Sequence, residues 1–343
     1  MIHYLTRLSR PTRATLSAGL FGLGLYTYDS CSEAQVLTRN VRTFYNGIAL
    51  AVDYKLNFKP GPTEADNQRI EALHERVANR IFDVFEKNGG LYIKIGQVIG
   101  TQAAVLPPAY HRRARKLFDA APAVSFNSVE RVFMEDFNGM HPSQVFAEFE
   151  MTPVASASIA QVHKARLKNG DVVAVKIQKP TIQKQMNWDL RAFRILLRVY
   201  EYLFELPLAW SSDYIEKHMR MEADFQTEAR YEHEKKKKRF VTHLYHRNAK
   251  KAWEHIQQEK SLKDKVYIPK VYDEYSSKRV LVCEWVDGIQ LTDTKSLKSK
   301  GLDYKEAMKI SIEAFASQIF RSGFVHGKCC FFLSFMCLIY LYR

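Results

Sequence analysis

A lysine in a strand-like run is the first residue whose type and setting suggest chemistry. The runs 159–167 and 172–177 flank an Asn-Gly pair, and Asn-Gly between two such runs is a strong signal for a β-hairpin. Side chains alternate between the two faces of a strand, so Lys176 should lie on the same face as Ala174. The sequence therefore predicts a hairpin that presents one lysine beside a small residue.

Small residues precede this hairpin and form a candidate phosphate loop. Kinases hold nucleotide phosphates with a lysine in a Val-Ala-X-Lys strand, one hairpin after such a loop. Small side chains let backbone N–H groups approach an anion closely. Lys176 ends a Val-Ala-Val-Lys run, which predicts a phosphate-binding lysine; the alternative is an edge-strand lysine that faces water. The candidate loop residues are Ala155, Ser156, Ala157 and Ser158.

A charged helix that begins near Asp213 offers carboxylates to such a lysine. A kinase lysine takes a helical glutamate as its ion-pair partner. Glu222 and Glu228 are six residues apart, so they project about 120° from each other and one helix could serve two lysines. The alternative is a solvated helix face, which we prefer for the run 232–239.

Helical patterns lie upstream of the hairpin. Apolar residues recur every three or four positions over 70–84, which predicts a helix with one buried face, and Asn-Gly-Gly at 88–90 should end it. The following segment, 91–104, contains Lys94, and its glycines four residues apart should let another backbone approach closely. A further helix is predicted over 125–138.

These motifs, in this order over about residues 82–327, resemble the UbiB/ABC1 (aarF-domain) family of atypical kinases. Lys94-x-Gly96-Gln97 is similar to the signature K-x-G-Q motif of that family, which lies in an N-terminal helical extension over the nucleotide pocket. Lys176 matches the nucleotide-binding lysine. The resemblance implies ATP or ADP as the ligand, with Mg²⁺ expected in the family.

The resemblance also assigns the carboxylates and the loop. Glu222-x-Asp224 matches the family's E-x-D motif, which pairs with the lysine of the extension, and Glu228 matches the helical partner of Lys176. The run 155–160 resembles the alanine-rich loop that replaces the glycine loop of other kinases. We therefore expect two ion pairs, Lys94 with Glu222 and Lys176 with Glu228.

An apolar strand over 280–284 that turns polar resembles a kinase hinge. By this resemblance, backbone groups of Glu284 and Val286 would bind adenine. The alternative is an ordinary buried strand that ends in Asp-Gly at 287–288.

The C-terminal part departs from the family. After an amphipathic stretch over 304–322, Phe-Val-His-Gly at 324–327 resembles the entrance to the family's catalytic loop, but Lys328 stands where the aspartate belongs, and 329–343 bears no likeness to the family. Phosphoryl transfer needs that aspartate and two further metal ligands, so no catalytic or metal-binding residue is assigned. We expect a catalytically incomplete chain.

The expected fold class is α+β: a protein-kinase-like N-lobe with an N-terminal helical extension and an incomplete helical C-lobe. The expected parts are a presequence with an N-terminal segment, the helical extension, the N-lobe up to the hinge, the start of the C-lobe and a divergent apolar tail. Their boundaries are 1–60, 61–150, 151–287, 288–327 and 328–343.

Charge and composition bear on partners and location. The formal net charge of +14 favours anionic partners such as nucleotide phosphates or anionic lipid. Nucleic acid is the weakest of these options because no binding module is recognised. Three arginines precede the first acid, Asp29, which is typical of a mitochondrial presequence; the alternative is a basic tail. These are Arg7, Arg10 and Arg13.

Three functions therefore stay open. The first is an ATP-dependent atypical kinase or ATPase, and the second is a non-catalytic nucleotide- or partner-binding protein. The third is a scaffold at the mitochondrial membrane surface, in contact with membrane lipid or membrane proteins.

Overall fold

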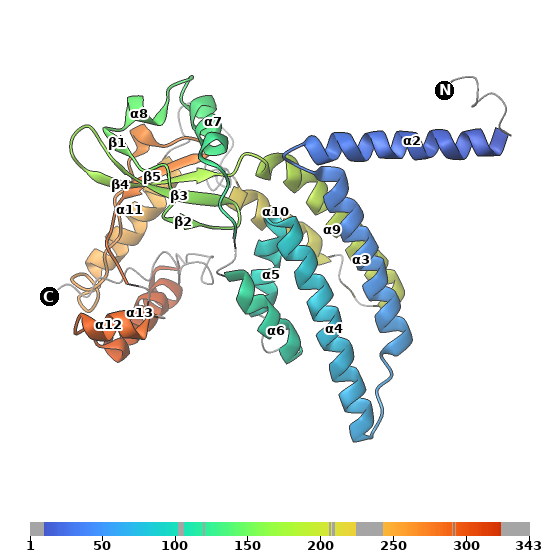
Figure 1. The fold of residues 1–343 in the computed structure, drawn as a ribbon. Helices are drawn as coiled ribbons and strands as arrows, with labels where there is room; N and C mark the ends of the chain where they lie inside the picture. The colour runs from blue at the N-terminus through green and yellow to red at the C-terminus, as the bar shows by residue number, and fades with distance from the viewer. Residues whose placement is uncertain are drawn as a thin grey trace. The chain divides into compact units, whose positions relative to one another are not determined.

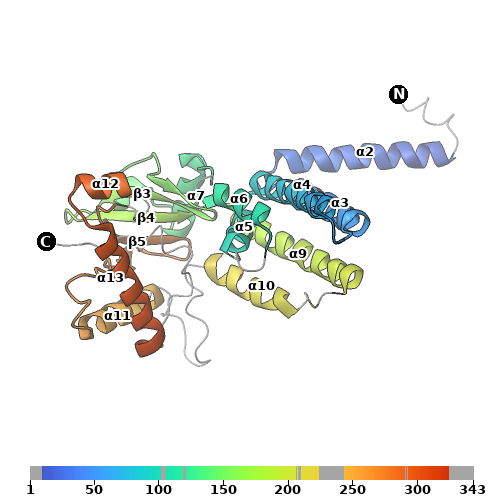
Figure 2. The same ribbon diagram turned by 90° about the horizontal axis from the view of Figure 1, so that it is seen from below.

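The structure is a computed structural model and divides into two compact units, which we call the helical unit and the sheet unit (Figures 1 and 2). The helical unit comprises Met1–Ala121 and Thr181–Met219, and the sheet unit comprises Pro122–Pro180 and Arg220–Arg343. The residues that the structure describes are 10–101, 106–118, 121–205, 207, 210–223, 243–289, 291 and 293–323.

The helical unit is built around α4 (Glu64–Asn88), the helix predicted from the apolar spacing. Thr63 caps its first turn by accepting a hydrogen bond from the Asp66 N–H, and the glycine after Asn88 ends it, as predicted. Its neighbours are α2 (Arg10–Cys31), α3 (Val36–Asn57), α5 (Leu91–Thr101), α6 (Pro108–Arg115), a 3₁₀ turn (Lys116–Phe118), α9 (Ile182–Phe204) and most of α10 (Trp210–Ala223).

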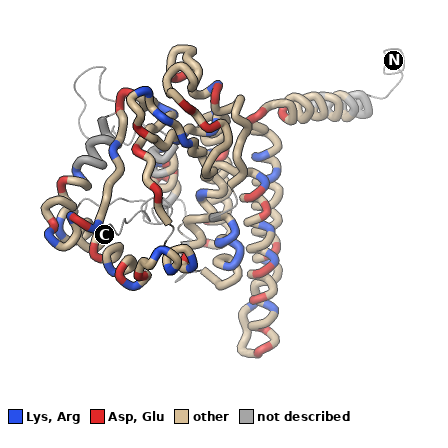
Figure 3. The backbone as a smooth tube through the Cα atoms, turned by 60° about the vertical axis from the view of Figure 1, so that its left-hand side comes forward, with Lys and Arg blue, Asp and Glu red and all other residues tan. Residues whose placement is uncertain are grey.

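The apolar face of α4 forms the core of this unit. Leu73, Val77 and Phe82 are each 1% exposed or less, and they pack with residues of α3, α5 and α6. Along α4, basic residues are interspersed with acidic ones (Figure 3). The excess of basic residues in the whole chain is therefore not carried by this helix. Within the part of the chain that the structure describes, no helix is long and apolar enough to cross a membrane.

The sheet unit contains a five-stranded antiparallel sheet with the order β1-β3-β4-β5, and β2 pairs with β3. The predicted hairpin is confirmed: β3 and β4 are joined by a turn in which Gly170 has φ 95°, a conformation that favours glycine. The strands are β1 (Glu148–Phe149), β2 (Ala155–Ser156), β3 (Ala160–Arg166), β4 (Val172–Gln178) and β5 (Val280–Glu284).

One face of this sheet is covered by α7 (Phe126–Asp136), the second predicted helix. Alternate residues of β4 and β5 pack against it, and the shared core has members that are 9% exposed or less. We call the opposite face the Lys176 face. The residues in the core on the α7 side include Val129, Val132, Phe133, Val173, Val175, Ile177, Val280 and Val282.

The rest of the sheet unit is helical. Ile310 and Ala314 of α13 pack with Ile256 of α11, so these residues of the predicted apolar face are buried, whereas Ile312 and Phe320 are 61% and 84% exposed. The chain then turns at Gly323 with φ 64°. These elements are α8 (Pro142–Val145), α11 (His243–Gln258), a 3₁₀ turn (Asp273–Tyr275), α12 (Thr294–Ser299), α13 (Tyr304–Ser317) and a π-helical turn (Gln318–Ser322).

The unit boundaries differ from the predicted ones. The predicted extension ran over 61–150, whereas the division falls between Ala121 and Pro122. The physical reason is that the apolar residues of α7 are buried against the sheet and not against α4. The segment 181–219 returns to the helical unit, and α3 belongs there too because Leu50 lies in its core.

Candidate functional site

Lys176 lies in β4, opposite Val162 of β3 and Leu281 of β5. It is partly exposed on the Lys176 face, beside Ala174, as the alternation predicted. Burial raises the pKa of the Cys283 thiol to about 11, and the positive charge of Lys176 opposes this rise. The cross-strand neighbours of Lys176 on this face, Val162 and Leu281, and the nearby pair of Ala174 and Cys283 are small or apolar.

Two further residues flank Lys176 on this face, and the sequence did not reveal them as candidates. Lys164 pairs with Ala174 across the strands, so it shares the face of Lys176. Its Nζ lies 4.9 Å from the centroid of the Trp285 ring, a distance at which a cation and an aromatic face attract each other. The Lys176 face thus combines two lysines with one aromatic ring, which suits an anionic ligand that carries a flat group.

The predicted phosphate loop is a tight hairpin between β2 and β3. Ala155 pairs with Val162, and the N–H of Ala157 donates to the Ala160 carbonyl at 2.8 Å. Only Ser158 and Ile159 separate these two residues, and Ser158 is 2% exposed. Backbone hydrogen bonding and burial therefore restrain the conformation of this loop.

Lys179 holds this hairpin, and the sequence analysis missed it. Its Nζ donates to the carbonyl oxygens of Pro122 at 2.8 Å and Ala157 at 2.7 Å, and its backbone N–H donates to the Ile159 carbonyl at 2.9 Å. The side chain is buried, and this burial lowers the pKa of Lys179 to about 8. The sequence feature that could have indicated this role is the position of Lys179 three residues after Lys176. Alternation along a strand directs such a residue to the opposite side of the sheet.

The predicted hinge residues follow β5 in different environments. The Glu284 carboxylate accepts hydrogen bonds from Tyr267 Oη at 2.8 and 2.7 Å, and the Glu284 N–H donates to the Lys270 carbonyl at 2.8 Å. This N–H is therefore already paired within the protein, and the expected adenine contact through backbone groups of Glu284 and Val286 stays a prediction. Val286 is partly buried just beyond the strand.

The K-x-G-Q residues lie on α5, and Lys94 and Gln97 are both buried. Gln97 donates from Nε2 to the Leu117 carbonyl at 3.0 Å. A Cβ at Gly96 would lie 2.2 Å from Leu117 Cδ1 and 2.8 Å from Phe85 Cδ2. A Cβ here would force these side chains to shift, and the close approach is made by side chains, not by the backbone that was expected.

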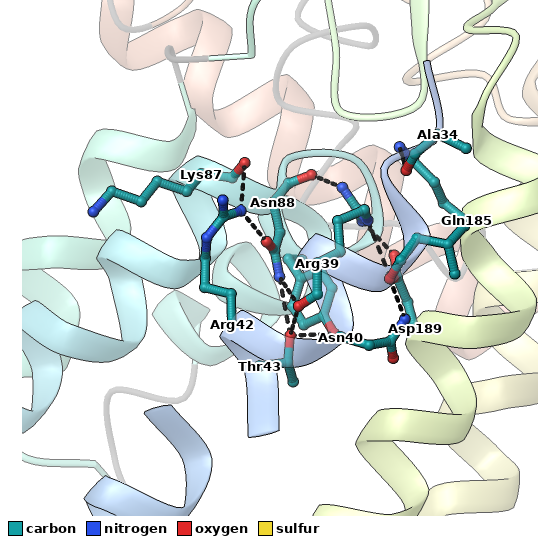
Figure 4. Close-up of polar contacts among 11 residues, drawn as sticks. Ala34, Arg39, Asn40, Arg42, Thr43, Lys87, Asn88, Gln185 and Asp189 are labelled. Atoms are coloured by element: carbon teal, nitrogen blue, oxygen red, sulfur yellow. Dashed lines mark hydrogen bonds and ion pairs between the residues drawn. The ribbon is translucent and has the colours of Figure 1, made fainter. Parts of the chain in front are cut away.

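A buried polar network holds the start of α5 (Figure 4). Arg39 of α3 donates from Nε to Asp189 Oδ1 at 3.3 Å, and its terminal nitrogens donate to Asp189 Oδ2 and to the Asn88 carbonyl. Asn88 Nδ2 donates to Thr43 Oγ1 at 3.0 Å, and this hydroxyl lies 2.8 Å from Tyr92 Oη. Burial raises the pKa of Asp189, although the hydrogen bonds from Arg39 oppose the rise.

This network acts at the connection between α4 and α5. Asn88 ends α4, and the next two residues, Gly89 and Gly90, have φ values of 64° and 52°, which glycine adopts without strain. A Cβ at Gly90 would lie 3.1 Å from Ile182 Cδ1. The network therefore fixes the direction in which α5, with Lys94, leaves α4.

The remaining candidates cannot be placed as side chains. Glu222 lies in α10, but its side chain is not described, and Asp224, Glu228 and Lys328 lie outside the described residues. The two predicted ion pairs, Lys94 with Glu222 and Lys176 with Glu228, stay predictions. Among the described residues, no group of three or more His, Cys, Asp or Glu side chains could hold a metal ion.

Comparison with known proteins identifies relatives of this chain. Residues 116–329 match the family model described as the ABC1 atypical kinase-like domain. An ABC1 family protein of Schizosaccharomyces pombe is 43% identical over 90% of this chain and 54% of its own length. AarF domain-containing protein kinase 1 of Xenopus laevis is 32% identical over 95% of this chain and 59% of its own length.

A solved structure, that of a Mycobacterium tuberculosis protein in complex with erythromycin, matches 66% of this chain and 52% of that chain, with 26% identity and a TM-score of 0.37. The chain spans about half the length of the curated relatives that it matches.

Proposed function

This chain belongs to the ABC1 atypical kinase-like family, and on that premise we propose that it binds an adenine nucleotide on the Lys176 face of its sheet. One observation carries the proposal: Lys176 lies on the face opposite α7, between strands that contribute small and apolar neighbours, with the tight hairpin at one end of the sheet. A phosphate-binding lysine needs this combination of charge, small neighbours and nearby backbone N–H groups.

The residues of this face fit such a ligand. Lys176 would bind phosphate oxygens, and the tip of the hairpin at 158–159 would add backbone N–H groups, since the N–H of Ala157 donates to the Ala160 carbonyl. Ala174, Leu281 and Cys283 are apolar neighbours of Lys176 on this face, each 8% exposed or less. Lys164 and Trp285 would border the site. The nucleotide supplies the phosphoryl group, and the protein residues named here bind and orient it.

Binding and transfer are separable in this proposal. Position 328 is lysine, where the family's loop has the aspartate that accepts a proton from the nucleophile. The family's magnesium ligands belong to the same region, which lies outside the described residues. We therefore propose that the 343-residue chain binds nucleotide without turning it over, and that a chain with the family's loop after Gly327 would turn it over.

Substitution of Lys176 tests nucleotide binding. We expect Lys176→Met to weaken ATP binding by about 10–100-fold, since a charge-assisted phosphate contact is lost. The matched control is Lys168→Met, which removes an exposed lysine from the turn of the same hairpin. Calorimetry with ATP and Mg²⁺ measures both. Equal affinity of the wild-type protein and Lys176→Met would refute the proposed site.

A scaffold function at a membrane surface is the second candidate, and the exposed side of α3 favours it. Six apolar residues at spacings of three and four follow one side of this helix, each between 40% and 69% exposed, and such faces mark interaction sites. Sedimentation with anionic vesicles tests it, using Val41→Ser with Ile48→Ser as the variant; unchanged sedimentation would exclude this surface. The six residues are Leu37, Val41, Tyr45, Ile48, Val52 and Leu56.

We place both candidate functions in the mitochondrion as part of the proposal. Arg7, Arg10 and Arg13, without an acidic residue among them, support import. A fluorescent reporter fused to residues 1–60 should enter mitochondria, and the same reporter with the three arginines changed to glutamine should stay in the cytosol. A cytosolic signal from the unmodified fusion would contradict this location.

A further inference from the structure

Two helices of the helical unit, α3 and α9, lie side by side along their length (Figures 1 and 2). Three hydrogen bonds along the pair join residues that are 150, 153 and 148 positions apart in the chain. Because this separation is nearly constant from one end to the other, the two helices run in the same direction. The bonded residues are Arg39 with Asp189, Gly47 with Tyr200, and Lys55 with Leu203.

Each of these helices leaves an apolar stripe exposed. On α3 the stripe consists of the six residues named above, whose neighbours are three or four positions apart. On α9 it consists of four residues, which are seven, four and three positions apart and between 37% and 85% exposed. Such spacings are typical of a helix that packs lengthwise against another helix. The α9 residues are Trp188, Ile195, Val199 and Tyr202.

The two stripes lie on the same side of the helix pair. A Cβ at Gly47 would lie 2.7 Å from Leu196 Cδ2, so these two residues face each other. Ile48 follows Gly47 by one position, and Ile195 precedes Leu196 by one position. One position is a rotation of about 100°, and on parallel helices that face each other, opposite rotations lead to the same side. The stripes therefore form one surface, which we call the α3–α9 face.

The area of the α3–α9 face matches one side of a stable protein interface. Its ten side chains expose on the order of 1,000 Å², if a large side chain has roughly 200 Å². The largest apolar patch on a monomer is typically about 300–600 Å², whereas a stable interface buries about 800 Å² on each partner. Two copies of this face therefore suffice for a dimer.

Helix geometry and charge indicate how two copies would meet. Two parallel helices with apolar stripes on one side are half of a four-helix bundle, and a second copy supplies the identical half. Lys184, Arg191 and Arg198 are exposed, and each precedes a member of the α9 stripe by four positions. They therefore lie along the edge of the face that is farther from α3. Because like charges repel across an interface, the two basic edges should be kept apart, which requires α9 of one copy to pack on α3 of the other.

We propose that the α3–α9 face binds the same face of a second copy of this chain, with α9 of each copy on α3 of the other. The apolar stripes form the core of this interface, and the basic residues of α9 stay at its solvated rim. The inference does not depend on nucleotide binding. It assigns a second copy, and not a membrane surface, to the exposed side of α3.

Glutamate substitutions in the two stripes test the dimer. Sedimentation velocity of the 343-residue protein over a range of concentrations should show a monomer–dimer equilibrium. We expect Ile48→Glu and Ile195→Glu each to weaken the dimer at least about 100-fold, because each buries an unpaired charge in the interface. Both isoleucines are at least 50% exposed in a single copy, so its fold should not change. The matched control is Met151→Glu in the sheet unit, where the side chain is 66% exposed; it should dimerise as the wild-type protein does.

Mixtures of variants test which helices meet. Ile48→Lys mixed with Ile195→Glu should restore a dimer, because the new lysine of one copy then faces the new glutamate of the other. Ile48→Lys mixed with Ile48→Glu should not, because each new charge then faces an unchanged isoleucine. Recovery in the second mixture alone would show that α3 packs on α3, and recovery in neither would show that the two faces do not meet.

Other results would give the face to a different partner. A wild-type protein that stays monomeric at all concentrations would refute the inference. If that monomer also sediments with vesicles of phosphatidylcholine and phosphatidylserine, and Ile48→Glu abolishes this binding, the face belongs to a membrane surface. A dimer that Ile48→Glu and Ile195→Glu leave unchanged would show that another surface holds the two copies together.

Discussion

Two buried cations, Arg39 in the helical unit and Lys179 in the sheet unit, are stabilised in different ways. Arg39 is 4% exposed and pairs with the carboxylate of Asp189. Lys179 is 7% exposed, and both hydrogen bonds of its Nζ among the described residues go to backbone carbonyls. The first cation has a counter-charge and the second has only dipoles. We expect this difference to change the free energy of unfolding in two experiments: removal of the partner of Arg39, and a rise in pH for Lys179.

The largest effect is expected at the ion pair. Asp189→Ala leaves the Arg39 guanidinium buried without its carboxylate, and should lower the free energy of unfolding by about 3–5 kcal/mol. Urea unfolding measures this loss. The matched control replaces both partners, Arg39→Met with Asp189→Leu, and should lose less because no uncompensated charge stays buried. If the double variant is less stable than Asp189→Ala, the hydrogen bond from Arg39 to the Asn88 carbonyl contributes more to stability than the ion pair does.

A smaller effect is expected from pH at Lys179. Its pKa is about 8 in the folded protein and 10.5 ordinarily, so the unfolded chain binds more protons between these values and stability from this group rises with pH across that window. Relative to Lys179→Met, the wild-type protein should gain on the order of 1–3 kcal/mol between pH 7.5 and roughly pH 10.5.

Urea unfolding of both proteins across this range checks the prediction. The other titrating groups are common to both proteins and cancel in the difference. If the difference in the free energy of unfolding between the two proteins does not change with pH, the Lys179 amine keeps its proton across this range. Lys179 would then behave like Arg39, whose charge is paired with a carboxylate.

The smallest effect separates packing from charge in the helical unit. Gly96→Ala places a methyl group 2.2 Å from Leu117 Cδ1, and overpacking of about 1–3 kcal/mol is partly offset by the higher helix propensity of alanine, about 1 kcal/mol. We expect a net loss of about 1 kcal/mol in urea unfolding. Gly22→Ala in α2, where a Cβ meets nothing within 4 Å, should be neutral or slightly stabilising. Similar results for the two variants would contradict the close packing of α5.

The features predicted from the sequence are those that nearby residues determine. The β3–β4 hairpin, the face of Lys176 and the helix around Leu73 follow from periodicity and from turn residues within about 20 positions of each other. For these elements the prediction and the structure agree because the spacing of apolar residues within each element already determines which of its sides is buried. The K-x-G-Q glycine was expected to allow close approach of a backbone, whereas side chains approach it.

The features that were missed depend on residues far apart in the chain. Arg39 and Asp189 are separated by 150 positions, and no local pattern connects them. In the sequence, Lys179 looks like any polar residue at the end of a strand. Its role is visible only in the structure, where the Pro122 and Ala157 carbonyls accept its hydrogen bonds. The packing of α7 against the sheet could not be predicted for the same reason, since its periodicity shows that one face is buried but not which partner buries it.

The interruption of the helical unit by the segment 122–180 has a consequence for the order in which the protein is made. Arg39 leaves the ribosome 150 residues before Asp189. At roughly 5–20 residues per second this delay is about 8–30 s. The β3–β4 hairpin, whose strands are neighbours in the chain, can form within microseconds of its synthesis. During translation β3 and β4 can therefore pair first. Arg39 of α3 stays hydrated until α9, which carries Asp189, has been synthesised.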